Sequence, residues 1–364
     1  MRQLFFELIQ VALGQRKILS RVPSPEEWQG VLLLARKQSI AGIAYHGVEL
    51  LSGKDQKPPR KILLTWFRLS EKVRQKNVIL DERSHELLSM LSKAGIRGCL
   101  LKGQGMACYY STELQGLRQS GDIDVYADCG RERIDAFAKD LGKKNIDWSY
   151  RHLHLKIWDD TLVELHYHIE SFFNPFKNSR FQKFVQQNKG MLFCSETAFV
   201  APSLTMNLFY ALLHIYNHIL SSRIGLKQVI DYYFLLRTAN ANFGTFENGE
   251  TLENVLRQFG MYRFAGGMMW LLQEITGLER HYMFCDPLER DGRLLLDKVI
   301  MPIDDDKGER HTHMAKDKDV MMFVFKRSSI LMTRYPSDAL WSPLWLVGQR
   351  FYKIVKNRKS QKTV

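Results

Sequence analysis

Apolar residues recur at helical spacing from the beginning of the chain. Leu4, Phe5, Leu8, Ile9 and Ala12 fall on one stripe, which predicts an amphipathic helix. The apolar part of this segment is too short to cross a membrane, and no small-residue cleavage site follows it. We therefore expect a packed helix here rather than a membrane anchor or a signal peptide.

Two further helices are predicted before residue 95. Ser24 is placed to cap a helix, with Pro25 in its first turn and Glu27 completing a capping box. A longer helical pattern then runs from about residue 62 to residue 91. Its expected buried side consists of Trp66, Phe67, Val73, Leu80, Leu87 and Leu91. We assign residues 1–94 to an N-terminal helical segment whose role is packing.

The pattern changes to a period of two residues in the next part of the chain, which is typical of strands. The predicted elements are strands at 96–101 and 122–127, a helix at 131–141, and a pair of strands at 148–158 and 161–169. Residues 95–170 are therefore expected to form an α/β core around a small sheet.

Helical periodicity returns after Pro202 and continues to about residue 300. Helices are predicted near residues 204–219, 226–237, 252–259, 264–275 and 288–300. We assign residues 171–303 to a helical domain, and residues 304–364 to a charged linker followed by an aromatic and basic segment. The expected fold class is α+β, with a mixed sheet, N-terminal helices and a C-terminal helical domain.

Composition adds limits on location and partners. The five cysteines are scattered without a CxxC pair, which favours reduced thiols and a cytoplasmic location. No uncharged apolar run reaches membrane-spanning length. The formal charge of +13 suggests partners that carry phosphate. Six basic residues lie in the last sixteen positions, so this tail is a possible nucleic-acid contact, although such tails are often only solvated.

Two aspartates stand on one face of the second predicted strand. Side chains alternate along a strand, so Asp122 and Asp124 point the same way while Ile123 and Val125 point into a core. Glu164 lies on the polar face of a later strand. Because adjacent carboxylates repel and Mg²⁺ accepts one or two carboxylates plus substrate phosphates, we predict that the three converge on Mg²⁺ or Mn²⁺ at a polar cleft.

Histidines offer a rival site. They occur as three pairs, His152 with His154, His166 with His168, and His214 with His218. His-x-His on a strand and His-x₃-His on a helix both suit zinc geometrically. No carboxylate or cysteine cluster completes a set in the sequence, so structural or orienting roles are expected. We predict that His214 and His218 line the wall of the cleft and bind no metal.

Several of these residues form a pattern that resembles the nucleotidyltransferase superfamily, and within it the bacterial uncharacterised nucleotidyltransferases, which are related to the minimal nucleotidyltransferases. The matching stretches are Leu101-Lys102-Gly103, Arg118-x-Ser120-Gly121-Asp122-Ile123-Asp124, Val163-Glu164-Leu165-His166, and a helical segment from Asn207 to Arg237 with His214, His218, Arg223 and Asp231. The similarity extends over about residues 1–300.

The resemblance implies a nucleotidyltransferase-like mixed sheet that carries two metal-binding aspartates and a third carboxylate. It also implies transfer of NMP from an NTP, with ATP expected, to an acceptor hydroxyl. Lys102, Gly103, Arg118 and Ser120 are then the expected NTP-binding residues. The superfamily's usual Gly-Ser turn is here Gly103-Gln104, and Lys102 and Arg118 are suited to replace the missing hydroxyl as phosphate ligands.

The sequence leaves the acceptor and the activity itself open. The acceptor can be a sugar phosphate, another small molecule, RNA or a protein. The alternative is a catalytically inactive nucleotidyltransferase fold that binds or regulates a nucleic acid or a protein. For the active reading, we expect Asp124→Asn to abolish transfer and to leave the metal-free fold unchanged or slightly more stable, because a like charge is removed.

Overall fold

The computed structural model describes residues 1–142, 147–195, 198–222, 224–301 and 317–361. Within this part of the chain the strands form one five-stranded sheet with the order β1-β2-β5-β4-β3. The strands are β1 (Gly98–Leu100), β2 (Ile123–Ala127), β3 (Asp147–Trp148), β4 (His152–Leu155) and β5 (Val163–His166). Only β2 and β5 are parallel, and the other neighbours are antiparallel. The expected α+β class with a mixed sheet is confirmed.

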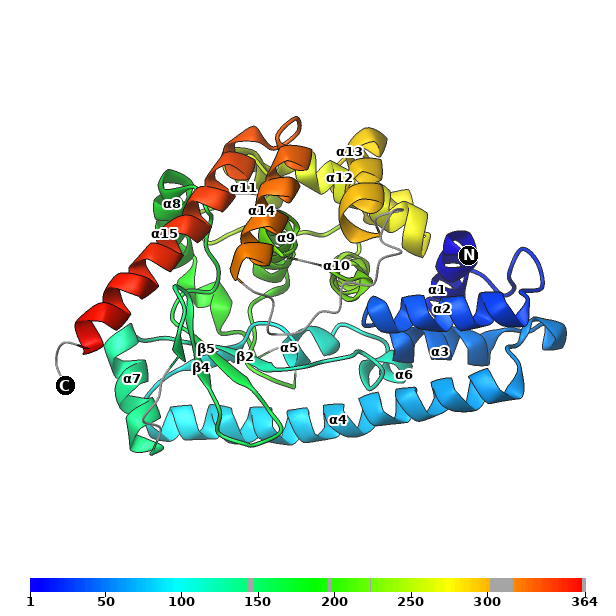
Figure 1. Cartoon of the computed structure of the whole chain (residues 1–364), viewed down its shortest axis with the longest axis horizontal. Coiled ribbons are helices and arrows are strands. Elements are labelled where there is room, and N and C mark those ends of the chain that lie inside the picture. Colours follow the sequence, from blue (N-terminus) through cyan, green and yellow to red (C-terminus); the bar gives the residue numbers. More distant parts are fainter. Residues whose placement is uncertain (143–146, 196–197, 223, 302–316, 362–364) are drawn as a thin grey trace.

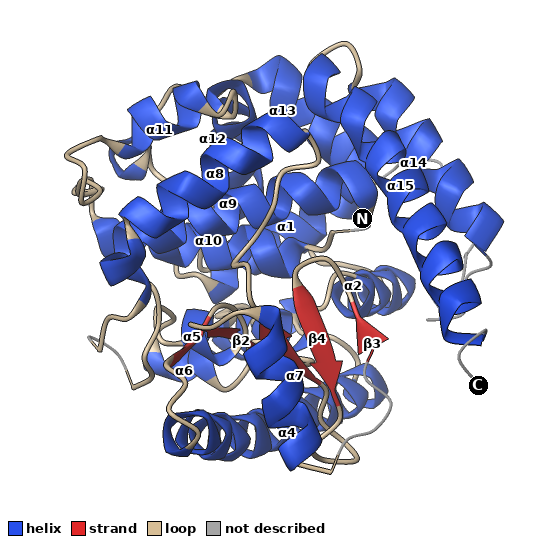
Figure 2. Ribbon diagram, turned by 90° about the vertical axis from the view of Figure 1, so that its left-hand side faces the viewer, coloured by secondary structure: helices blue, strands red, loops and turns tan. Residues whose placement is uncertain are grey.

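Two helices cover the apolar face of this sheet. The long helix α4 (Arg60–Lys93) runs beneath the strands, and α7 (Arg131–Asp140) packs beside it (Figures 1 and 2). Leu87 and Leu91 of α4 share one buried cluster with Val125 of β2 and Leu165 of β5. This cluster holds the apolar side chains that alternate with the polar ones along β2 and β5, which fixes the polar side chains on the opposite face.

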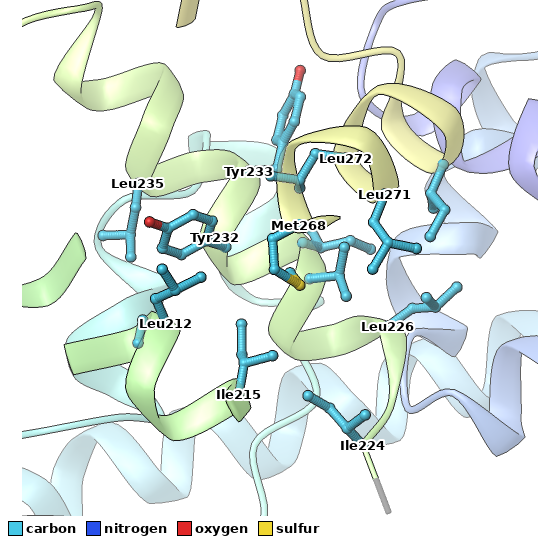
Figure 3. Packing of buried hydrophobic residues seen from close by; sticks show 14 of the residues in the cluster. Leu212, Ile215, Ile224, Leu226, Tyr232, Tyr233, Leu235, Met268, Leu271 and Leu272 are labelled. Atoms are coloured by element: carbon cyan, nitrogen blue, oxygen red, sulfur yellow. The ribbon is translucent and has the colours of Figure 1, made fainter. Parts of the chain in front are cut away.

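A second and larger hydrophobic core lies on the polar side of the sheet, and it contains residues from both the N-terminal and the C-terminal parts of the chain. It combines the N-terminal helices with the helical region after residue 200. The helices involved are α1 (Arg2–Ala12), α2 (Pro25–Lys37), α3 (Ala41–Leu50), α9 (Leu204–Ser221), α10 (Leu226–Ala239) and α12 (Tyr262–Thr276). In Figure 3, Ile215 of α9, Leu226 of α10 and Met268 of α12 surround one part of this core.

Shorter helices and the C-terminal pair complete the molecule. They are η1 (Lys54–Gln56), α5 (Gln104–Ala107), α6 (Thr112–Gln115), α8 (Pro175–Gln187), η2 (Lys189–Leu192), α11 (Leu252–Gln258), η3 (Arg280–Tyr282), α13 (Glu289–Leu295), η4 (Leu296–Ile300), α14 (Asp317–Leu331) and α15 (Pro336–Gln361). Most of the predicted charged linker, and all side chains of the basic tail, lie outside the described residues. Among the described helices, none has the length and apolarity that a membrane crossing needs.

Most predicted elements are confirmed, with local differences. Ser24 and Glu27 form the expected capping box at the start of α2. Phe67 was wrongly placed on the buried side of α4, because it is 45% exposed. The predicted strand at 148–158 is split into β3 and β4, and the predicted strand at 161–169 is shortened to β5, since residues 149–151, 156–162 and 167–169 form bends and loop. The domain boundaries remain predictions, and the N-terminal helices share their core with the helical region.

Candidate active site

A row of polar side chains crosses three strands of the sheet in register. Asp124 of β2 pairs with Glu164 of β5, and Glu164 lies opposite His154 of β4. Two residues along each strand, His166 of β5 lies opposite His152 of β4. Residues two apart on a strand share a face, so this register gathers all five side chains on one side of the sheet.

Asp124, His152 and Glu164 of this polar face line one wall of a cavity of about 280 Å³. Helices α9 and α10 supply the opposite wall, above the strands in Figure 1. The sheet wall contributes Lys102, Asp122, Asp124, His152 and Glu164, and the helical wall contributes Tyr210, His214, His218, Lys227 and Asp231. The cavity therefore lies between the sheet and the helical region, as the predicted cleft requires.

Asp124 and Glu164 approach each other at the centre of the sheet wall. One ligand atom from each, together with one from His166, lie within 4.8 Å of one another, a spacing that a single metal ion can span. Asp122 lies immediately before β2 and lines the same cavity, although it belongs to no such cluster among the described residues. Glu164 is thus on the same face as Asp124, and the metal-binding role of all three carboxylates stays a prediction.

The charges of the sheet wall are only partly compensated. Lys102 Nζ lies 2.6 Å from Asp124 Oδ1, and His166 Nε2 lies 3.0 Å from the same oxygen. Burial raises the pKa of Asp124, but Lys102 and His166 outweigh it and lower that pKa. The pKa of Asp122, in contrast, is raised by the charge of Asp124 and by burial. Asp122 therefore carries the electrostatic repulsion that a bound cation would relieve.

The loop after β1 brings Lys102 and Gly103 to the cavity. Gly103 has φ +55°, a conformation that favours glycine, and it turns the chain from β1 into α5. The neighbouring Gln104 is buried and donates to Asp81 of α4 instead of lining the cavity. The residue that replaces the superfamily's serine thus anchors this loop to the helix beneath the sheet.

Arg118 occupies the junction between the sheet and the helical wall. Its guanidinium is 3% exposed and forms a bidentate ion pair with Asp231 of α10, with Nε and Nη2 at 2.7 and 2.8 Å from the two carboxylate oxygens. It also donates to Ser120 Oγ, and Tyr110 donates to Asp231. Arg118 and Ser120 line the cavity, and their predicted contact with NTP stays a prediction.

Sequence reasoning missed two basic residues of the cavity. Lys227 on α10 is half-buried, and no ion pair involves it in the described part of the chain. Burial and the nearby Arg118 lower its pKa. Its spacing of four residues from Asp231 was a usable signal, because both fall on one face of a helix. Arg151 also lines the cavity and pairs with Glu170.

The histidines fall into two groups. His214 and His218 line the helical wall as predicted, and His214 Nδ1 lies 3.0 Å from Glu170 Oε2. Arg223, from the same predicted segment, lies outside the described residues. The expectation that no carboxylate completes a histidine set was wrong. His152, His154 and Glu164 form such a set, because the β4–β5 register places Glu164 opposite His154, and His152 lies two residues away on the same face of β4.

A second cavity, of about 680 Å³, adjoins the first through Ser120, which lines both. The described residues around it include four basic side chains and no carboxylate. These basic side chains are Arg36 and Lys37 of α2 and Lys72 and Lys76 of α4. The N-terminal segment therefore does more than pack against the helical region, and it presents positive charge beside the candidate active site.

Comparison with known proteins agrees with this arrangement. Neither the curated proteins nor the solved structures include a match to the chain. A family model described as uncharacterised nucleotidyltransferase matches residues 24–277, which is more than half of the sequence and includes every residue of both cavity walls named above. The chain therefore belongs to the family of uncharacterised nucleotidyltransferases.

Proposed function

We propose that this protein is a metal-dependent nucleotidyltransferase that moves NMP from an NTP to an acceptor hydroxyl. The observation that carries the proposal is the in-register pair of Asp124 and Glu164, beside Asp122 and Lys102, on the wall of a cavity. Membership of the family supports the reaction class. ATP is the NTP that we expect.

The carboxylates fit the divalent metal that this chemistry uses. Asp122, Asp124 and Glu164 would hold Mg²⁺ or Mn²⁺, both of which prefer oxygen ligands. The spacing of Asp124 and Glu164, whose ligand atoms lie within 4.8 Å of each other, fits a cation, and the charge of Asp124 and burial raise the pKa of Asp122 beside them. When bound, the metal neutralises phosphate charge and increases the acidity of the acceptor hydroxyl.

The basic residues of the cavity would position the triphosphate. Lys102 and Lys227 approach from opposite walls, so together they can contact phosphate oxygens on two sides. Lys102 already neutralises Asp124 at 2.6 Å, and phosphate oxygens offer its ammonium further partners. Arg118 would act through Asp231 and Ser120, by holding the loop before β2 against α10.

The second cavity favours an acceptor that carries negative charge. Its four basic side chains and its shared boundary at Ser120 would place an anionic group next to the site of transfer. A sugar phosphate or RNA has such groups, whereas a neutral small molecule or a protein hydroxyl does not require them. We expect the acceptor to be anionic.

The experiment that tests the function uses NTP labelled at a chosen phosphate. The protein is incubated with Mg²⁺ and a small-molecule and RNA extract, once with α-labelled and once with γ-labelled NTP. Nucleotidyl transfer moves the α label to the acceptor and releases the γ label as pyrophosphate. Transfer of the γ label alone would identify a phosphotransferase and contradict the proposal.

The alternative, an inactive fold that binds or regulates a partner, is distinguished by thermal unfolding. A ligand that binds only the native state raises the melting temperature, and the stabilisation increases with the logarithm of the ligand concentration divided by Kd. An active site should require Mg²⁺ together with NTP for the full shift. NTP stabilisation without Mg²⁺ dependence would favour the inactive reading. Nucleic-acid binding through the basic tail should weaken steeply with salt and disappear on truncation after Gly348.

A further inference from the structure

Three side chains on the polar face of the sheet are arranged as metal ligands of a different kind from the aspartates. His152 Nε2 and His154 Nε2 are 2.9 Å apart. Glu164 Oε1 lies 3.2 Å from the His154 nitrogen and 3.7 Å from the His152 nitrogen. Bonds of about 2.0–2.1 Å to Zn²⁺ at tetrahedral angles separate the ligand atoms by about 3.3 Å. The three distances are close to this value.

Hydrogen bonding can satisfy these contacts only if the single Nε2 hydrogen of His154 is shared between His152 Nε2 and Glu164 Oε1. An imidazole has at most one hydrogen on Nε2. If His154 donates that hydrogen to Glu164, its nitrogen has no lone pair with which to accept from His152. If His154 instead accepts from His152, it presents a lone pair to the carboxylate oxygen. A cation at the centre satisfies all three atoms at once.

The charge distribution also separates this cluster from the aspartate side. Lys102 contacts Asp124 at 2.6 Å, so a positive charge already lies there. The ion pairs of Glu164 Oε1 in the described part of the chain are only with His152 and His154, whereas Glu164 Oε2 faces His166 at 3.3 Å. The two oxygens of Glu164 therefore face different ligand sets.

We propose that His152, His154 and Glu164 Oε1 bind a borderline-soft divalent cation of the Zn²⁺ class, at a second site that adjoins the Mg²⁺ site of the aspartates and shares Glu164 with it. Imidazole ligands select such ions, whereas carboxylates and water select Mg²⁺. Three protein ligands leave a fourth position for water or an acceptor hydroxyl. The metal site does not depend on the proposed transfer reaction, because its test needs no NTP.

The test uses Co²⁺ as a spectroscopic substitute for Zn²⁺, on untagged protein stripped of metal with a chelator. We expect the wild type to bind one equivalent of Co²⁺ with the visible absorption of a tetrahedral site, and Zn²⁺ to displace it. Excess Mg²⁺ should not displace the bound Co²⁺. The variant His154→Ala should weaken Co²⁺ binding by more than about 100-fold, which exceeds the typical cost of losing an outer partner of a ligand.

Two controls keep the proposal falsifiable. His168→Ala removes a neighbouring histidine outside the cluster and should leave the Co²⁺ spectrum unchanged. Asp122→Asn should also retain it, which separates this site from the aspartate site and from any failure of NMP transfer. If His154→Ala does not fold, His154→Gln replaces it, and circular dichroism verifies the fold. Absence of stoichiometric Co²⁺, its retention in the His154 variant, or its displacement by Mg²⁺ would overturn the proposal.

Discussion

The two walls of the cleft carry carboxylates under different electrostatic conditions. On the helical wall, Asp231 has a bidentate guanidinium partner in Arg118. On the sheet wall, Asp124 forms an ion pair with Lys102, and imidazoles contact Asp124 and Glu164. Lys227 and Arg151 also act on these carboxylates, but among the described residues neither forms an ion pair with them. The carboxylates of both walls are buried or half-buried, but they differ in how their negative charge is neutralised.

This difference distinguishes charged residues that stabilise the fold from charged residues that can bind a cation or a substrate. The charge of a buried carboxylate is neutralised by its own guanidinium partner, and removing either partner leaves an unpaired charge in the interior. Carboxylates that outnumber their cations retain affinity for added positive charge, such as a metal ion. We therefore expect changes on the sheet wall to affect transfer most, and changes on the helical wall to affect stability most.

The largest expected effect is that of Asp124→Asn on transfer. We expect the rate at saturating Mg²⁺ and NTP to fall by about three orders of magnitude or more, because a metal ligand is lost from chemistry that depends on positioning and charge stabilisation. The measurement is a single-turnover assay with labelled NTP. A near-wild-type rate would remove the aspartates from the mechanism.

The same variant tests a correction to the expectation from sequence. Like-charge repulsion alone predicted a neutral or stabilising effect on the metal-free fold. In the structure, Lys102 and His166 hold the pKa of Asp124 below its usual value despite burial, so its ionised form stabilises the fold at pH values above the unfolded pKa. We now expect Asp124→Asn to destabilise the metal-free protein by about 1–3 kcal/mol.

A matched control lies at the end of the same strand. Asp128 Oδ1 lies 2.5 Å from Lys189 Nζ, outside the residues that line the cavity. Asp128→Asn repeats the chemical change and also removes a lysine partner. It should lower the melting temperature and leave transfer within about twofold. Equal losses of transfer in both variants would point to a general loss of structure.

The next largest effect is expected on the helical wall. Asp231→Asn removes the charge that pairs with the buried Arg118, and breaking a buried pair from one side costs about 3–5 kcal/mol. Chemical unfolding measures the loss. Glu253→Gln, which breaks the exposed pair with Arg257, serves as the control and should have no measurable effect.

Kinetics of the same variant resolve the role of Arg118. If Arg118 acts only by holding the loop before β2, the KM for NTP should change little at temperatures where Asp231→Asn is folded. If the guanidinium binds phosphate, its release from Asp231 should change that KM. A transfer loss as large as that of Asp124→Asn would abolish the distinction between the two walls.

The face of the sheet that carries the candidate site could be predicted from sequence, because it follows from a local rule. Side chains alternate along any strand, so the apolar positions of β2 and β5 place Asp124 and Glu164 opposite to the core. The start of the helix at Ser24 could be predicted for the same reason, because its capping box is formed by residues three positions apart. Such features depend on neighbours within four residues.

The partners of these residues could not be predicted, because they depend on register and on long-range packing. His154 meets Glu164 only because the β4–β5 hairpin adopts one particular register, and slipping by one residue would move it to the other face. Arg118 and Asp231 are 113 residues apart in sequence. The basic cavity between α2 and α4 depends on how the two helices pack, which periodicity does not specify.

A smaller effect concerns the pH dependence of stability through His214. Burial, Lys102 and His218 lower the pKa of His214 well below its usual value, and Arg151 and His166 act in the same direction. Glu170 faces the imidazole at 3.0 Å, but its charge is shared with Arg151. The folded state therefore keeps His214 neutral, while the unfolded chain binds a proton below pH about 6.5.

The sign of the effect follows from this difference. Because the unfolded state binds more protons, stability falls as pH decreases below about 6.5, by at most about 1.4 kcal/mol per pH unit for one group. His214→Gln, which retains a donor to Glu170, should make the dependence of unfolding free energy on pH less steep between pH 7 and 5. A steeper slope in the variant would mean that Glu170 holds the proton on His214.

The smallest expected effect is that of Tyr110→Phe on the helical wall. The Tyr110 hydroxyl donates to Asp231 Oδ1 at 2.6 Å, and its ring packs on Phe234. The substitution removes one hydrogen bond to a charged group and retains the ring, while Arg118 still satisfies both oxygens of Asp231. We expect a loss of about 1–2 kcal/mol in unfolding free energy and no change in transfer. Combining it with Asp231→Asn measures the coupling, and a double variant no less stable than Asp231→Asn alone would show that the hydroxyl stabilises the fold only through that carboxylate.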